Sequence, residues 1–367
     1  MKPVSSWSAR GAACLGAAAL VCACGPEDSS GTVRAYVYQM DPATHAYALG
    51  IADVEHLESL RELRGRDIDV RRGAEFNMTL AGIEVKRGSP FSLEYTVRDD
   101  GVVVPGDMHS FYALSMYRNF DRIASFMRGH RFVPAARLDV LYFPRIDNVL
   151  MGDQRSSLTD NAAFAFEARG FLIVPSFVLS DLPMFLNEGV MAHEYGHAII
   201  HQLLFPSGVE PASDAHLLAM HEGVADLIGF AETGDPNYIL PTADADRDLS
   251  VPRTYTSEEY SALLTSQNDV LPTWDPHADG STMARAIYEL WPKDAGGKIA
   301  ETERLRMLDV VLAALGSITY QEGAFTLGTF PDALVAQLPP ADQAAACAVL
   351  TSRLAPLSAA LTNCGAP

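Results

Sequence analysis

The sequence predicts an α+β protein, with a β-rich N-terminal half followed by a mainly helical C-terminal half. In residues 33–38 apolar positions alternate with polar or aromatic ones, and strand-like runs follow at 76–85 and 91–97. From residue 187 onward the apolar spacing is mostly that of helices. Strands that gather ahead of the helices, rather than alternating with them, are typical of this fold class.

The elements between and beyond these runs follow in order, without an internal repeat. Residues 107–128 have a helical period, and residues 138–143 and 164–178 have the composition of strands. A helix is expected at 187–204. Further helices are expected at 213–233, 257–265, 281–291, 300–315 and 340–354.

The first 23 residues have the features of a secretory signal. They carry two basic residues and no acidic one, and the apolar run over 11–23 is too short to span a bilayer. The sequence VCACG at 21–25 resembles a bacterial lipobox, in which the cysteine, here Cys24, is lipid-modified. By that resemblance Gly25 favours anchoring at the outer membrane. An ordinary signal peptide with incidental cysteines is the alternative.

The segment 24–31 is rich in Gly, Ser and acidic residues, and we expect it to be a flexible tether. The remaining chain is long enough to bury two cores. We expect a β-rich N-terminal subdomain over 32–205, which includes the helix at 187–204, and a helical C-terminal subdomain over 206–367.

The chain carries a formal net charge of −19 at pH 7. Removal of the signal takes away Lys2 and Arg10 and no acid, so the charge of the exported chain becomes −21. Such a surface repels nucleic acid and anionic lipid head groups, so neither is an expected partner. Beyond the signal no run of 18 apolar residues occurs, so no transmembrane helix is expected.

The cysteines fall into two groups. Three lie in the export segment, and Cys347 and Cys364 lie near the C-terminus. Because an exported protein meets an oxidising environment, we expect these two to form a disulfide that closes the C-terminal tail.

The expected helix at 187–204 contains the sequence HEYGH. His193 and His197 are four residues apart, so they project from one face of a helix and can reach the same ion. Glu194 lies beside them. This is the HExxH pattern, in which two neutral imidazoles hold zinc and the carboxylate takes a proton from a water molecule.

A second acidic segment completes a metal site. A catalytic zinc needs a third protein ligand and an open fourth position, and Glu222 offers a carboxylate 25 residues after His197. Asp226 is one helical turn further along the same face. There it can accept the free N–H of a ligand imidazole and fix its tautomer.

Other assignments are open for these residues. His201 continues the histidine stripe, but the next turn of a helix lies about 5.4 Å further on, too far for a zinc–nitrogen bond of roughly 2 Å. We expect it to be structural. His221 points about 100 degrees away from Glu222 and is expected to pack or to lie at the rim. A buried polar helix face without a metal is the alternative for the whole set.

These segments resemble the thermolysin-like and fungalysin-like zinc metallopeptidases, whose third ligand is the Glu of an ExxxD helix. A third similar segment, residues 275–290, is the one in which a His opens a helix and stabilises the oxyanion, which gives His277 that role. The resemblance covers about 107–290. It implies a two-subdomain fold with zinc in the cleft, an endopeptidase acting on proteins or peptides, and Glu194 as the general base.

The resemblance also suggests residues that hold the substrate. In the family an Arg near Arg247 binds a substrate carbonyl, and a surface Arg paired with acids is the alternative here. A sheet edge beside the zinc pairs with extended substrate, and the segment containing Asn161 and Ala162 is the candidate. An ordinary core strand is its alternative.

Two features separate this chain from the family pattern. The pattern has a Tyr between the second His and the Glu ligand, whereas residues 198–221 contain none. Tyr255 or Tyr288 could replace it, and loss of such a donor costs about 10²–10³ in rate. The acidic run at 244–252 is a candidate for Ca²⁺, although it lacks EF-hand spacing.

Two alternative functions follow. One is a surface binding protein that keeps the peptidase fold with weak or no catalysis, which the missing Tyr favours. The other is a peptidase of a different HExxH group, in which the resemblance of the His277 segment is coincidence.

Overall fold

The computed structural model describes residues 30–41, 44–79, 82–148, 161–174, 182–208, 214–240, 242, 247–265 and 275–365. The expected export signal, Cys24 and the tether up to residue 29 lie outside these ranges, as do residues 244–246 of the acidic run. Among the described helices, none combines the length and the apolar character needed to cross a membrane.

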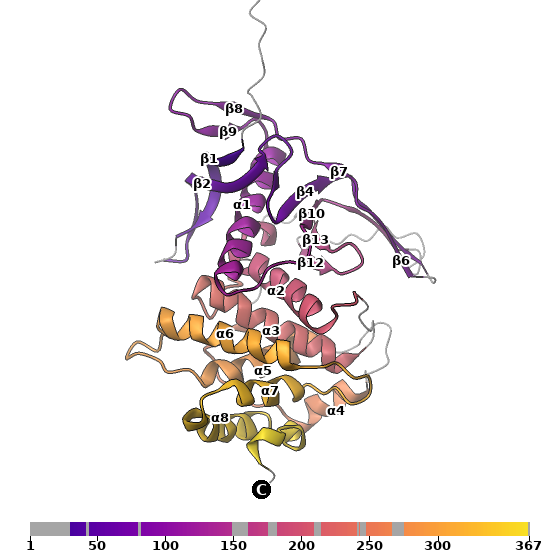
Figure 1. Ribbon diagram of the computed structural model, residues 1–367, viewed down its shortest axis with the longest axis vertical. Helices are drawn as coiled ribbons and strands as arrows, with labels where there is room; N and C mark the ends of the chain where they lie inside the picture. Colours follow the sequence, from indigo (N-terminus) through magenta and orange to yellow (C-terminus); the bar gives the residue numbers. More distant parts are fainter. Residues whose placement is uncertain are drawn as a thin grey trace, which may run out of the picture.

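The described strands form one large mixed sheet and one small sheet (Figure 1). They are β1 (Gly31–Met40), β2 (Tyr47–Ser59), β3 (Arg64–Gly65), β4 (Ile68–Arg72), β5 (Glu75–Thr79), β6 (Gly82–Lys86), β7 (Ser89–Pro90), β8 (Tyr95–Val97), β9 (Val103–Pro105), β10 (Leu138–Tyr142), β11 (Arg145–Asn148), β12 (Asn161–Ala165) and β13 (Gly170–Val174). The large sheet has the order β12-β13-β10-β4-β3-β2-β1-β9-β8, with β7 beside β4, and the small one β11-β5-β6.

The helices lie mainly below the sheets in Figure 1, and the C-terminus is at the bottom. They are α1 (Met108–Gly129), α2 (Glu188–Leu204), α3 (Ala215–Thr233), α4 (Ser257–Thr265), α5 (Pro276–Glu289), α6 (Glu301–Ser317), α7 (Thr329–Gln337) and α8 (Pro340–Arg353). Helix α2 lies where the sheet-containing part meets the helical part, and it packs against α1, β12 and α3.

Helix α1 joins the sheet to the helical part of the molecule. It begins after Asp107, whose side chain accepts a hydrogen bond from the backbone N–H of Ser110 at 2.7 Å. Tyr117 and Phe120 are three residues apart and fully buried, so one face of the helix is covered. The Phe120 ring stacks on that of Phe171 in β13 at a centroid distance of 4.2 Å. The helix expected at 107–128 is confirmed. Its contact with β13 holds the sheet against the helical part of the molecule.

The mixed α and β content agrees with the expected class, since the described strands all precede α2. Several boundaries differ. The run expected as one strand at 76–85 is two strands, β5 and β6, and only residues 95–97 of the run at 91–97 are strand. Gly31, expected in the tether, already belongs to β1.

The helical half also differs in detail. Helix α5 begins at Pro276, earlier than the helix expected at 281–291, and α7 was not expected. Cys347 in α8 and Cys364 form a disulfide, as the sequence predicts. This bond fastens the C-terminal tail to the last helix.

Candidate metal centre

Helix α2 carries two histidines whose side chains point in the same direction. Its N-cap is Asn187, whose side-chain oxygen accepts hydrogen bonds from the backbone N–H groups of Gly189 at 2.9 Å and Val190 at 3.3 Å. One turn apart on this helix, His193 and His197 bring their Nε2 atoms to 3.2 Å from each other. The spacing in the sequence therefore places both imidazoles on one face.

Helix α3 supplies the third group. Oε2 of Glu222 lies 3.2 Å from Nε2 of His193, and Oε1 lies 3.7 Å from Nε2 of His197. Atoms that bind one tetrahedral zinc at 2.0–2.2 Å are separated from each other by about 3.3–3.6 Å. The three side chains thus form a group that could hold a metal ion, and their ligand atoms all lie within 4.8 Å of one another.

In the metal-free protein the imidazoles of His193 and His197 have different pKa values. Burial holds the pKa of His197 well below its usual range, so this ring is neutral and ready to bind a metal. Burial and the charge of Arg247 would also lower the pKa of His193. The carboxylates of Asp226 and Glu222 outweigh them and raise that pKa to about 9. Metal binding at Nε2 of His193 therefore displaces a proton.

Helix α5 approaches α3 closely because both carry glycine at the contact. A Cβ atom added to Gly280 would lie 2.7 Å from Cβ of Glu222, and one added to Gly223 would lie 2.3 Å from the Gly280 carbonyl oxygen. This packing brings His277, near the start of α5, to 3.2 Å from Oε2 of Glu222 through its Nε2. Nδ1 of His277 lies 2.8 Å from the carboxylate of the N-cap residue, Asp275.

Asp226 is fully buried one turn beyond Glu222. Its Oδ1 lies 3.0 Å from Nδ1 of His193, as the sequence predicts for a carboxylate that orients a ligand imidazole. Burial alone would raise the pKa of Asp226, but the Arg247 guanidinium and the His193 ring outweigh it and hold that pKa well below its usual range. Ser281 of α5 donates to Oδ2 of Asp226 at 2.7 Å.

Arg247 belongs to this site and is not a surface residue. Its guanidinium donates to Oδ1 of Asp226 and lies 3.4 Å from Oε2 of Glu222. The same Nη2 atom lies 3.2 Å from Nδ1 of His193. The sequence-based expectation that Arg247 reaches the cleft is consistent with this position, and the alternative of an exposed ion pair is wrong.

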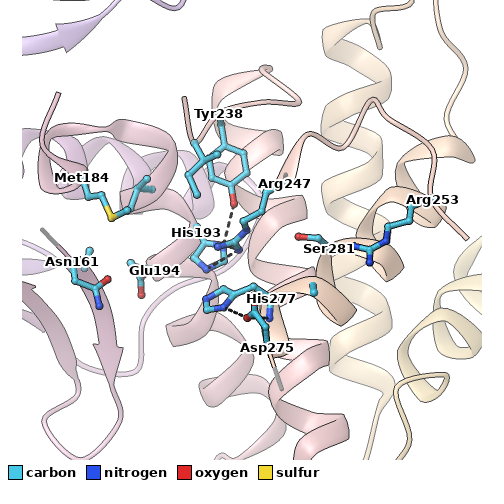
Figure 2. A pocket seen from close by; sticks show the side chains of 14 residues that line it. Asn161, Met184, His193, Glu194, Tyr238, Arg247, Arg253, Asp275, His277 and Ser281 are labelled. Atoms are coloured by element: carbon cyan, nitrogen blue, oxygen red, sulfur yellow. Dashed lines mark hydrogen bonds and ion pairs between the residues drawn. The ribbon is translucent and has the colours of Figure 1, made fainter. Parts of the chain in front are cut away.

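Glu194 faces the cleft from α2, on the side of His193 away from Arg247 (Figure 2). The backbone N–H of Phe164 in β12 donates to its carboxylate. Burial raises the pKa of Glu194 to about 7, with Glu222 adding to the rise and His193 opposing it. A carboxyl group with that pKa can both accept and donate a proton near neutral pH.

Strand β12 forms one wall of the cleft. It is the edge strand of the large sheet in the described part of the chain, as expected for the segment that contains Asn161 and Ala162. Both residues line a cavity of about 460 Å³ together with His193, Glu194 and His277. A second cavity of about 330 Å³ continues along β12 on the His197 side. The cleft therefore runs past the His193, His197 and Glu222 side chains, beside a strand that is at the edge of the sheet in the described part of the chain.

Two further histidines and two tyrosines are accounted for by packing. His201 stacks on the ring of Phe166, and His221 stacks on the ring of His197. Neither belongs to the three-residue group, as expected. Tyr255 and Tyr288 are 1% and 3% exposed and do not line the described cavities, so the suggestion that one of them replaces the missing Tyr is wrong.

Sequence reasoning missed three polar residues at the centre. Tyr238 follows α3 in a loop, and its hydroxyl donates to Oδ1 of Asp226 at 2.5 Å. Asp275 and Ser281 lie in the segment that carries His277, but no spacing rule assigns them a partner. For Tyr238 and Ser281 the signal was indirect, because a buried carboxylate at 226 requires several donors.

No protein-family model matches the chain, and no curated protein matches it.

Proposed function

We propose that this protein is a zinc-dependent endopeptidase of the thermolysin-like or fungalysin-like type. The observation that carries the proposal is the convergence of His193, His197 and Glu222 from two helices, with Glu194 beside them in a cleft. The mixed sheet above and the helices below are compatible with the two-subdomain architecture of that group. Bound nucleic acid is not expected at so acidic a chain.

The donor set supports zinc as the metal. Two imidazole nitrogens and one carboxylate oxygen are the ligands of many catalytic zinc sites, which leave a further position open. When bound, zinc supplies a Lewis acid that polarises a carbonyl oxygen and acidifies water. The cavities on both sides of His193 leave room for water and for a substrate. Calcium stays a prediction, because the acidic run is only partly described.

The residues of the chain would divide the remaining work. Glu194 takes a proton from the attacking water and passes it to the leaving amine, which its pKa of about 7 permits. His277 lines the cleft, its Nδ1 is held by Asp275, and its Nε2 lies 3.2 Å from Oε2 of Glu222 in the metal-free structure. In the metal-loaded protein Nε2 is the candidate donor to the oxygen on which negative charge develops. Arg247 is the candidate to bind a substrate carbonyl.

The edge strand supports a peptide substrate. Strand β12 pairs with β13 on one side, and Asn161 and Ala162 line the cleft. An extended peptide can add to such an edge through backbone hydrogen bonds. Export and lipid anchoring through Cys24 at the outer membrane remain part of the proposal on the sequence pattern at residues 21–25.

A zinc assay and a cleavage assay on the purified protein test the proposal. We expect one zinc per chain by elemental analysis, casein cleavage that a zinc chelator abolishes, and recovery on adding zinc. Glu194→Gln should keep the zinc and lower cleavage by about 10²–10⁴. Glu167→Gln is the matched control, because Glu167 is exposed in the turn after β12. Full cleavage by Glu194→Gln would remove the general base from the proposal.

A surface binding protein with the same fold is the second candidate function. It is favoured because the tyrosine that lines the described cavity with His277, Tyr238, uses its hydroxyl on Asp226 and His193, which leaves fewer donors for an oxyanion. In that case zinc is bound with the expected stoichiometry, yet casein is not cleaved with or without added zinc.

A further inference from the structure

Tyr238 contacts His193 at Nδ1, whereas His197 and Glu222 lie near Nε2 of the same ring. The loop that carries it follows the end of α3 and is hydrogen-bonded to Asn187 at the start of α2. Its hydroxyl lies 3.1 Å from Nδ1 of His193 and donates to Oδ1 of Asp226 at 2.5 Å. Figure 2 shows the Tyr238 hydroxyl directed at His193, among the residues that line the cleft. The side chain is only 3% exposed.

Two glycines form a slot for its ring. A Cβ atom added to Gly189 of α2 would lie 2.7 Å from the Cβ of Tyr238, and one added to Gly229 of α3 would lie 2.9 Å from its Cζ. Real Cβ atoms do not approach that closely. Any side chain at either position would therefore push the hydroxyl away from His193.

The backbone of the loop is held as well. Asn187, the N-cap of α2, donates through Nδ2 to the carbonyl oxygens of Tyr238 at 3.0 Å and Ile239 at 3.3 Å. The same amide contacts Oγ1 of Thr242 at 3.1 Å. Asn187, which caps α2, therefore also fixes the position of Tyr238 relative to that helix.

The two oxygen atoms beside Nδ1 favour one tautomer of His193, and the remaining neighbour of Nδ1 is Nη2 of Arg247 at 3.2 Å. If Nε2 binds a metal it must be free of hydrogen, so Nδ1 carries the proton and needs an acceptor. Asp226 Oδ1 and the Tyr238 oxygen both lie within 3.1 Å of Nδ1. Because the tyrosine gives its own proton to Asp226, its oxygen faces Nδ1 as an acceptor.

We propose that Tyr238 is a positioning residue of the metal centre, which holds His193 with Nε2 free for the metal and fixes the Asp226 carboxylate that supports it. This inference rests on the proposed metal site and adds to it a residue outside the HExxH and ExxxD motifs. Groups that orient a ligand imidazole typically change metal affinity or activity by roughly 10–100-fold.

The test compares zinc affinity in the full exported chain. Tyr238→Phe removes only the hydroxyl, and Tyr195→Phe is the control, because the Tyr195 hydroxyl is buried in the same helix as the ligands without a hydrogen-bond partner in the described structure. Zinc dissociation constants come from competition with a chromogenic chelator. The visible spectrum of the Co²⁺ forms reports the ligand field, which a merely structural role would leave unchanged.

We expect Tyr238→Phe to bind zinc about 10–100-fold more weakly with an altered Co²⁺ spectrum, and Tyr195→Phe to match the wild type. Gly229→Ala, which keeps the hydroxyl but crowds the ring, should weaken zinc binding in the same direction. Wild-type affinity and spectrum in Tyr238→Phe would overturn the role of Tyr238 and leave the proposed function standing. A wild-type protein that binds no zinc would overturn both.

Discussion

The buried carboxylate of Asp226 offers the sharpest test of how the centre is held together. It lies 3.0 Å from Nδ1 of His193, and it accepts hydrogen bonds from Tyr238, Ser281 and Arg247. Asp226→Asn keeps the shape of the side chain but removes its charge and replaces one accepting oxygen with an N–H donor. The perturbation therefore leaves a buried guanidinium without its main counter-charge.

The size of the loss follows from the burial of the pair. Removing one partner of a buried ion pair costs about 3–5 kcal/mol of unfolding free energy. Arg247 is 17% exposed in its side chain and keeps Glu222 at 3.4 Å, so we expect the lower end, about 3 kcal/mol, for the metal-free protein. The pair of Arg306 with Asp342 is the control, because both side chains are exposed and Asp342→Asn should cost at most about 1 kcal/mol.

Urea unfolding of the metal-free variants measures these values. Adding Arg247→Met to Asp226→Asn should recover part of the loss, because the unpaired cation is then removed, with a coupling of about 0.5–3 kcal/mol. A loss no larger than that of Asp342→Asn, or strictly additive effects in the double variant, would refute the reasoning.

The same comparison has a defined pH dependence. The pKa of Asp226 is lower in the folded protein than in the unfolded chain, where it is about 3.9. Its stabilisation is therefore complete above the unfolded pKa and is lost as the pH falls towards the folded one. The stability gap between wild type and Asp226→Asn should shrink below about pH 4. It should also shrink as the pH rises towards 9, because the Asp226 carboxylate helps to raise the pKa of His193.

Three other changes have expected outcomes. Replacing Cys347 and Cys364 by Ser opens a loop with a sequence separation of 17 and should cost about 3 kcal/mol in urea unfolding, without loss of zinc; an unchanged midpoint would show that the tail contributes nothing. Gly280→Ala places a Cβ atom 2.4 Å from the Ala219 carbonyl oxygen, so it should lower the melting temperature and also impair casein cleavage, and a fully stable, active variant would contradict the packing of α5 on α3. Binding of zinc to the metal-free protein near pH 8 should release a proton, because the pKa of His193 is raised to about 9. Calorimetry in buffers of different ionisation enthalpy measures this release, and a binding enthalpy that does not depend on the buffer would contradict the prediction.

The helices were largely predictable because their signals are local. Asp107 caps α1 and Asn187 caps α2, and both helices have apolar side chains at helical spacing. The pairing of His193 with His197 was predictable for the same reason, since the two residues share a helical face whatever the rest of the chain does. Helix α7 was missed because it is short and has no side-chain cap.

The sheet was less predictable because its pairing is not local. Apolar residues alternate at 76, 78 and 80 and then at 83 and 85, so the alternation changes phase at Ala81–Gly82. The single strand expected at 76–85 overlooked this break between β5 and β6. Strand β10 pairs in parallel with β4, which lies some 70 residues earlier in the chain, and nothing in either strand alone specifies that partner. The edge position of β12 likewise depends on the whole strand order.

The parts of the site that sequence reasoning missed share this cause. Tyr238 reaches His193 only because α2 and α3 pack with Gly189 and Gly229 around its ring. Arg247 could be assigned to the cleft only through the family resemblance, since its contact with Asp226 joins two segments of no fixed spacing. Ligand motifs within a helix can be recognised from the chain, whereas the groups that orient the ligands appear only when the helices meet.

The location of the metal tests the central claim most directly. Anomalous diffraction from crystals of the zinc-loaded protein, recorded on both sides of the zinc edge, should show one strong peak about 2.0–2.2 Å from Nε2 of His193, Nε2 of His197 and a carboxylate oxygen of Glu222. Absence of a peak there at full zinc loading, or a peak held by other side chains with Glu222 turned away, would contradict it.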